Sequence, residues 1–267
     1  MSESARVEPW KLVLIGLAAG VLSGGLGVGG GIILVPLLVI VGLDRHRAHA
    51  TSLAAIMPIA VAGAASYGLS GELALALGVA IGLGGAAGSV IGATVMHRSS
   101  PRMLTIIFSA LLVLVAVRMI SGAEPLPGTT DLSSVLQVAV AVGIGAIAGF
   151  FAGLAGIGGG VVIVPAGVFL LALSQHEAQG VSLVAIVFTA VAATVVNRRN
   201  RRVRLSDGLV AGVGGIVGSI LGSQVALAMT GRTLSVIFGF LVLFAAVQSL
   251  YRGWRSRSQP PETETVL

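Results

Sequence analysis

The chain has 267 residues, of which 55% are hydrophobic and only 10% are charged, and its mean hydropathy is +1.02. Soluble domains carry about 25% charged residues, so the composition argues against a soluble fold, and it excludes a disordered chain, which needs low hydrophobicity. The absence of cysteine excludes disulfides, thiolate metal sites and cysteine nucleophiles. The net charge of +6 fits arginines in the cytoplasmic loops of a membrane protein better than a nucleic-acid partner.

The first long uncharged run, residues 12–43, is too long to cross a membrane once as a straight helix. At about 1.5 Å per residue, this run would measure about 48 Å and the later run at 132–175 about 66 Å, whereas a bilayer core is about 30 Å thick. We therefore predict that each run breaks and folds back. The breaks are predicted at the clusters Gly27, Gly29, Gly30, Gly31 and Gly156, Gly158, Gly159, Gly160, because adjacent glycines disfavour a helix.

A proline follows each glycine cluster. Pro36 and Pro165 both come five residues after the last glycine of their cluster. Proline is tolerated near the start of a helix, where its missing amide has no partner within the helix. The pattern predicts two short helical limbs that begin near Ile32 and Val161 and carry these prolines in their first turns.

The other apolar runs predict longer membrane helices. In chain order they are residues 48–71, 73–96, 103–117, 178–197, 208–231 and 233–251. Together with the two broken runs, they predict an all-α membrane protein of two five-segment halves, each with a short re-entrant limb after its glycine turn. The predicted division is an N-terminal membrane repeat at 1–120, an extracytoplasmic linker at 121–131, a C-terminal membrane repeat at 132–254 and a cytoplasmic tail at 255–267.

The two halves resemble each other in sequence. Residues 20–36 and 149–165 agree at eight of 17 positions, six of which are glycines. Further along, an offset of 130 pairs Ser52 with Ser182. Because one register holds over most of the chain, composition alone does not explain the similarity, and we predict an internal duplication.

Two further glycine series have a four-residue spacing. They are Gly84, Gly88 and Gly92 in the first half and Gly214, Gly218 and Gly222 in the second. Small residues at this spacing let two membrane helices approach closely. We therefore interpret these glycines as packing positions and not as a site.

The positive charges predict how the halves are oriented. With a cytoplasmic N-terminus and five segments per half, 14 of the 16 lysines and arginines lie inside, against 11 with four segments per half. Cytoplasmic loops carry an excess of these residues, so the count favours five segments. An odd number of segments inverts one half relative to the other. We expect a multi-pass protein of the cell membrane with both termini in the cytoplasm.

Broken helices at matched positions of inverted halves indicate the binding site of a secondary transporter. The first amides of a restarted helix lack acceptors and lie at the positive end of the helix dipole, so they bind an anion without any positive side chain. We therefore predict a small anionic substrate bound by the turns and the nearby hydroxyls. The candidate substrate-binding residues are Gly27, Gly29, Gly30, Gly31, Pro36, Ser52, Gly156, Gly158, Gly159, Gly160, Pro165 and Ser182.

A family resemblance rests on three segments: GLGVGGGIILVP at 25–36, ATSL at 50–53 and GLAGIGGGVVIVP at 153–165. Through these segments the chain resembles the TauE/SafE sulfite exporter family, also known as the toluene-sulfonate uptake permease group. The resemblance covers nearly the whole chain and implies a multi-pass transporter of a bacterial-type inner membrane. It also implies small sulfur-containing anions as substrates, such as sulfite, sulfonates and sulfoacetate. In the second half GVSL replaces ATSL, so Thr51 has no hydroxyl counterpart.

Several polar side chains have two interpretations. Ser52 and Ser182 could bind an oxyanion, or they could bond back to a carbonyl one turn earlier in their own helix. The same alternatives apply to Ser23, which precedes the first turn. His49 is the candidate for proton coupling, because histidine titrates near neutral pH.

Other classes of function lack the required residues. The sequence has no HExxH motif and no histidine at the centre of an apolar run, so we expect no enzyme activity, no metal and no cofactor. An anion channel or a structural membrane subunit is the alternative to a carrier. The expected partners are the anionic substrate and the lipid bilayer, without nucleic acid, and the glycine-rich surfaces would permit a homodimer.

Overall fold

The computed structural model describes residues 7–95, 101–122, 133–155, 159–199 and 205–255, and within these ranges the protein consists of helices without strands. The helices of the first half are α1 (Pro9–Leu26), α2 (Gly31–Ile40), α3 (Arg45–Leu69), α4 (Leu75–Val95) and α5 (Pro101–Ser121). Those of the second half are α6 (Ser134–Ala155), α7 (Gly160–Leu170), α8 (Gln175–Arg199), α9 (Leu205–Leu227) and α10 (Gly231–Arg255). Each half therefore has its short helix in second place, as the sequence predicts.

The first long apolar run breaks at its glycine cluster. Gly27, Gly29 and Gly30 have φ angles of 69°, 78° and 67°, a left-handed conformation that costs other residues about 1–2 kcal/mol each. The chain therefore leaves the helix after Leu26 and starts again at Gly31. The second run also has a break, between Ala155 and Gly160, and the predicted site residues Gly156 and Gly158 lie outside the described residues.

The two prolines lie in the second turn of their short helices. Pro36 is the sixth residue of α2 and Pro165 the sixth residue of α7, because both helices begin one residue earlier than expected. At the sixth position of a helix, proline lacks the amide that would otherwise donate a hydrogen bond to the carbonyl four residues earlier. Each short helix therefore has an interruption in its hydrogen-bond ladder close to its start.

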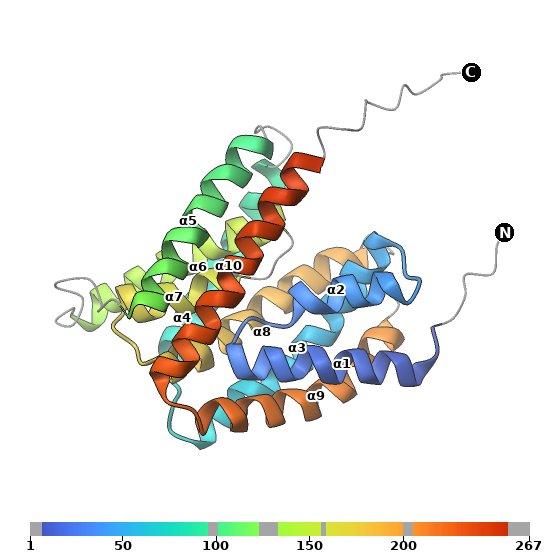
Figure 1. The fold of residues 1–267 in the computed structure, drawn as a ribbon, viewed down its shortest axis with the longest axis horizontal. Coiled ribbons are helices and arrows are strands. Elements are labelled where there is room, and N and C mark those ends of the chain that lie inside the picture. The colour runs from blue at the N-terminus through green and yellow to red at the C-terminus, as the bar shows by residue number, and fades with distance from the viewer. Residues whose placement is uncertain (1–6, 96–100, 123–132, 156–158, 200–204, 256–267) are drawn as a thin grey trace.

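Matching helices of the two halves make matching contacts. Helix α1 packs against α9 just as α6 packs against α4, while α3 contacts α8 and α5 contacts α10 (Figure 1). The glycine series makes these approaches possible. A methyl group on Gly214 or Gly218 would collide with backbone oxygens of α1, and one on Gly84 or Gly88 would collide with backbone oxygens of α6. The packing role predicted for these four glycines is therefore confirmed.

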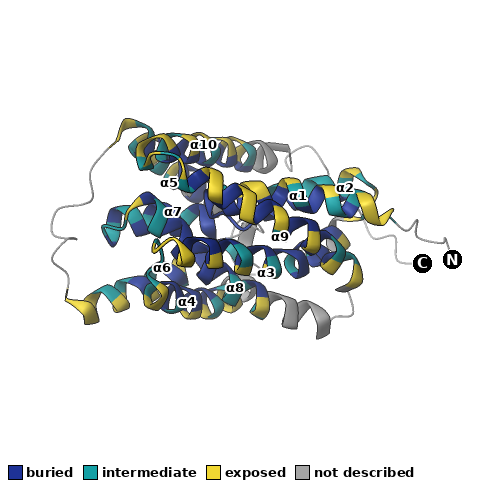
Figure 2. Cartoon of the chain, turned by 90° about the horizontal axis from the view of Figure 1, so that it is seen from below, coloured by how far each residue is buried: buried dark blue, intermediate teal, exposed yellow. Residues whose placement is uncertain are grey.

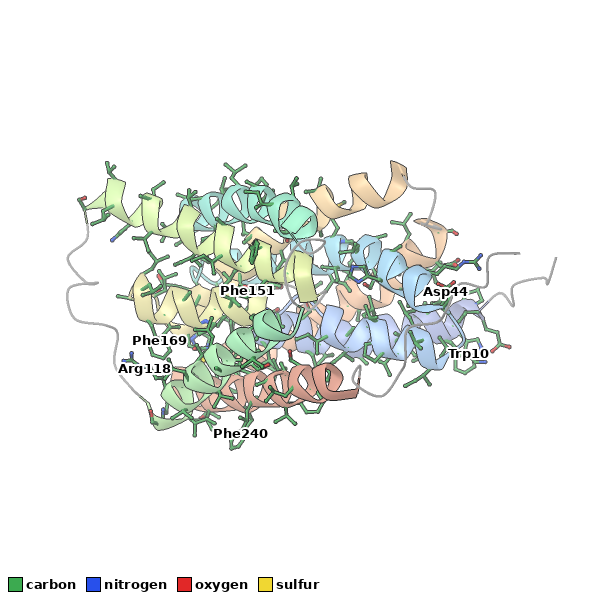
Figure 3. All side chains as sticks on the ribbon, turned by 90° about the horizontal axis from the view of Figure 1, so that it is seen from above. Trp10, Asp44, Arg118, Phe151, Phe169 and Phe240 are labelled. Carbon is green, nitrogen blue, oxygen red and sulfur yellow. The ribbon has the colours of Figure 1, made fainter. Side chains whose placement is uncertain are left out.

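Labelled residues mark two opposite ends of the molecule (Figure 3). Trp10, at the start of α1, and Asp44, just before α3, lie at one end. Arg118 near the end of α5 and Phe169 near the end of α7 lie at the other, with Phe151 of α6 between them. Helix α1 therefore runs inward from one end of the molecule, and α2 runs back toward the same end.

The outer faces of the bundle are apolar. Buried positions line its inside and exposed ones lie along the outer helix faces (Figure 2), and the exposed set includes large apolar side chains such as Leu14, Leu114, Leu221 and Phe244. Five of the described helices are long and apolar enough to cross a bilayer: α1, α3, α6, α9 and α10. These features define a multi-pass membrane protein.

Candidate functional site

The first glycine turn is buried and presents backbone amides without acceptors. Gly27, Gly29, Gly30 and Gly31 are all buried. The ladder of α2 starts with the amides of Ile33 and Leu34, which donate to the Gly30 carbonyl at 3.1 and 2.8 Å. Within the part of the chain that the structure describes, the amides of Gly31 and Ile32 donate no hydrogen bond. A helix start of this kind attracts anions.

The start of α7 lies directly against the first turn. A methyl group on Gly160 would lie 2.5 Å from the carbonyl oxygen of Gly27 and 2.7 Å from the Cα of Val28, so only glycine permits this approach. The amides of Gly160 and Val161 also donate no hydrogen bond among the described residues. Both restarted helices thus contribute bare amides to the same buried region.

Helix α8 supports the first turn through Ser182. Its side chain is fully buried, and its hydroxyl donates to the carbonyl oxygen of Gly27 at 2.7 Å. Gln179 lies one turn earlier on α8, and its backbone packs against Gly27. Residues three apart share one helix face, so this face of α8 holds the turn in place.

Ser52, the partner of Ser182 in the first half, makes a different bond. It is buried in α3, and its hydroxyl donates to the carbonyl oxygen of His49 at 2.8 Å. This bond is the local alternative considered for the serines. His49 is half-buried one turn before Ser52. Of the prolines, Pro165 is buried and Pro36 half-buried, and Gly159 is buried at the cap of α7.

Two residues near the first turn were not predicted from the sequence. The Tyr67 hydroxyl lies 2.6 Å from Oε1 of Gln179 and 3.0 Å from the carbonyl oxygen of Gly24, and both side chains are fully buried. A polar residue in an uncharged run has the same pattern whether it joins helices or binds a ligand. The one further signal was that Gln179 stands at the position of His49 in the duplicated register.

The buried polar groups of the described chain are all neutral. They are the side chains of Ser23, Thr51, Ser52, Ser66, Ser109, Gln175, Gln179, Ser182, Ser219, Ser223 and Ser249. In the same ranges no three His, Asp or Glu residues are grouped as metal ligands. Amides, hydroxyls and helix dipoles are therefore the groups that can hold an anion in this region.

An apolar bundle with two broken helices and a buried, amide-lined meeting point is typical of a membrane transporter. Comparison with known families gives the same class. The family described as Sulfite exporter TauE/SafE matches residues 2–119 and 141–267. The chain belongs to this family, as its motifs suggested, and so to a family of membrane transporters and not of enzymes.

The relatives span nearly the whole chain. A "Probable membrane transporter protein" of Xylella fastidiosa (strain Temecula1 / ATCC 700964) is 31% identical over 252 residues, covering 91% of this chain and 94% of its own length. The "Probable membrane transporter protein YunE" of Bacillus subtilis (strain 168) is 24% identical over 265 residues, covering 91% and 97%. No solved structure matches the chain.

Proposed function

We propose that the protein is a secondary transporter that moves small sulfur oxyanions, namely sulfite, sulfonates or related organosulfur anions, across the cell membrane by alternating access. One observation carries this proposal: the starts of α2 and α7 bring unpaired amides to one buried place, where Gly160 touches Gly27 and Val28. Such amides stabilise an anion at membrane depth. The description of the family names sulfite, which has this chemistry.

The two halves are proposed to be inverted copies. The matching contacts of α1 with α9 and of α6 with α4 support a two-fold relation between them. The placement of Asp44 and Phe169 supports the inversion, since the α1–α2 pair returns to one end of the molecule whereas α7 runs to the other. On this basis residues 1–120 and 132–254 are the membrane repeats. Most of the proposed linker 121–131 and tail 255–267 lies outside the described residues.

The contacts between the halves suggest how access could alternate. Ser182 and Gly160 of the second half hold the turn of the first half. A rocking movement of one half against the other would have to break or shift these contacts. Gly27, Gly160 and Ser182, which the sequence proposes as substrate-binding residues, would therefore couple movement to binding. His49 is the proposed site of proton exchange.

The proposed orientation places both termini in the cytoplasm. Lysines and arginines gather in the segments that this orientation puts inside, in agreement with the positive-inside rule. The end of the molecule that carries Trp10 and Asp44 would then face the cytoplasm.

Transport by purified protein in liposomes tests the proposal. We expect saturable uptake of labelled sulfite or methanesulfonate, accelerated by the same anion trapped inside the vesicles. Ohmic single-channel current without this counterflow would instead identify a channel. Absence of transport for both anions by folded protein would overturn the proposal.

A matched pair of variants tests the site. Gly30→Ala and Gly71→Ala both place alanine at a positive φ, of 67° and 78°, at a cost of about 1–2 kcal/mol. Gly71 has open space around it, whereas Gly30 caps α2 and lies against Ala19 and Ser23. We expect Gly30→Ala alone to lose transport. Equal transport by the two variants would remove the first turn from the site.

A further inference from the structure

Two buried polar atoms beside the first turn have no hydrogen-bond partner among the described residues. They are Oγ of Ser23 and Nε2 of Gln179, and both side chains are 0% exposed. Buried polar atoms are normally satisfied, because leaving one unpaired is costly. Polar atoms of this kind beside bare helix amides point to a ligand that pairs with them.

Ser23 lies beside the start of α2. Its Cβ is 3.5 Å from the position that a Cβ on Gly30 would take, and Gly30 is the N-cap residue of α2 and supplies no side-chain cap. The Ser23 hydroxyl also donates no hydrogen bond to a carbonyl of its own helix in the described structure. Its hydroxyl is therefore available as a donor next to the amides of Gly31 and Ile32.

Gln179 approaches the same turn from α8. The Tyr67 hydroxyl is 2.6 Å from Oε1 of its carboxamide, and its backbone packs against Gly27. The Tyr67 hydroxyl has one proton, which it donates to Oε1 at 2.6 Å in preference to the Gly24 carbonyl oxygen at 3.0 Å. The Nε2 group on the other side of the carboxamide then has no partner among the described residues. Tyr67 thus acts as a positioning residue that orients Gln179 as a donor.

We infer that Ser23 and Gln179 complete an oxyanion site at the first turn, and that this site selects singly charged anions such as sulfonates or hydrogen sulfite over divalent ones such as sulfate. The inference rests on the proposed transport function and names the charge class of its substrate. It assigns Gln179 the role of a specificity-determining residue.

The selectivity follows from the neutral character of the site. The nearest neighbours of the glycines in the first turn are all uncharged: Ala19, Ser23, Ile56, Gln179, Ser182 and Ile186. The cost of removing an ion from water rises with the square of its charge, whereas its attraction to fixed dipoles rises only in proportion to the charge. Dipoles and neutral donors that stabilise a singly charged anion therefore do not offset the desolvation cost of a doubly charged one.

The two halves differ at the positions that supply these neutral donors. His49 stands at the position of Gln179 and Ala152 at the position of Ser23. The extra neutral donors therefore belong to the first turn only, and the two turns would make unequal contributions to binding.

The test compares methanesulfonate and sulfate, which are similar in size and differ in charge, in liposomes at mildly alkaline pH. We expect wild-type protein to transport methanesulfonate, and sulfate to compete at least about tenfold less well. Gln179→Met should lower kcat/KM for methanesulfonate about 10- to 100-fold, as expected for a lost hydrogen bond to a charged group. Gln179→Glu should abolish transport.

Gln224→Met is the matched control for Gln179→Met, because Gln224 is exposed on α9; it should transport normally. Thermal unfolding in detergent verifies that each variant is folded. Tyr67→Phe keeps the ring but no longer holds the carboxamide of Gln179, so it should raise KM more than it lowers kcat. Equal competition by sulfate, or unchanged kinetics in Gln179→Met, would overturn the inference while leaving the transport function intact. Failure of the wild type to move either anion would instead overturn the proposed function, and this inference with it.

Discussion

At the scale of single residues, Ser182 connects the two halves at the candidate site. Its hydroxyl donates to the carbonyl oxygen of Gly27, 155 residues earlier in the chain. Because both groups are buried, the bond fixes the shape of the first turn as well as stabilising the fold. Ser52 has the equivalent sequence position but bonds within its own helix, so the described structure joins the halves through Ser182 and not through Ser52.

Ser182→Ala should lower the free energy of unfolding by about 1–3 kcal/mol, because the buried carbonyl of Gly27 loses its donor. Thermal unfolding in detergent measures this effect. Ser66→Ala is the control, since its hydroxyl bonds only to the Ala62 carbonyl in its own helix, and it should cost less. Equal stability of Ser182→Ala and wild type would show that the bond does not hold the turn.

Sequence patterns predicted some of these residues and not others. The glycines were predictable because a run longer than a bilayer must break, and glycine is where it breaks most easily. Tyr67 and Gln179 were not, because their meeting depends on which faces of α3 and α8 pack together. Nor could the sequence decide between a local and a distant acceptor for Ser52 and Ser182, since a serine rotamer depends on its surroundings.

At the scale of helices, the close packing of α1 on α9 depends on glycines that have no room for a side chain. A Cβ on Gly20 would collide with the carbonyl of Gly215, and one on Gly149 would collide with that of Gly85. Helix positions and breaks followed from the sequence, because apolar length and glycine spacing are local features. Which helix packs against which was not predicted, since that depends on the whole arrangement.

Gly20→Ala should destabilise the protein by about 1–3 kcal/mol, because α1 and α9 must move apart. Gly143→Ala is the matched control: Gly143 lies in α6 with nothing within 4 Å of its Cβ position, so the change should be neutral or stabilising by about 0.4–1 kcal/mol. Thermal unfolding of the two variants side by side measures the difference. Destabilisation of the same size in both would contradict the close approach.

At the scale of the whole molecule, the proposed transport mechanism depends on two halves that enter the membrane from opposite sides. Trp10 and Asp44 mark one end and Arg118 and Phe169 the other. This orientation remains a prediction, which the sequence makes from the distribution of lysines and arginines, because cytoplasmic loops carry an excess of positive charge. The relative placement of the two turns required the three-dimensional structure.

The natural absence of cysteine allows a direct topology experiment. Single cysteines at Glu8, Asp44 and Ser121, all exposed, can be labelled in intact cells with a membrane-impermeant maleimide. We expect labelling of Ser121→Cys only, and labelling of Glu8→Cys and Asp44→Cys once the membrane is opened. Labelling of Asp44→Cys and Ser121→Cys from the same side would contradict the inverted arrangement.

The proposed function depends on an oxyanion that binds where the starts of α2 and α7 meet, and anion-dependent thermal unfolding of Gly160→Ala tests this binding. A ligand present at about 100 times its Kd stabilises a folded protein by about 2.7 kcal/mol, so methanesulfonate should raise the Tm of wild type and of Gly143→Ala. In Gly160→Ala the new methyl group would lie 2.5 Å from the Gly27 carbonyl oxygen, and the anion should produce no rise above that variant's own lower Tm. A rise as large as that of the wild type would contradict binding at this place.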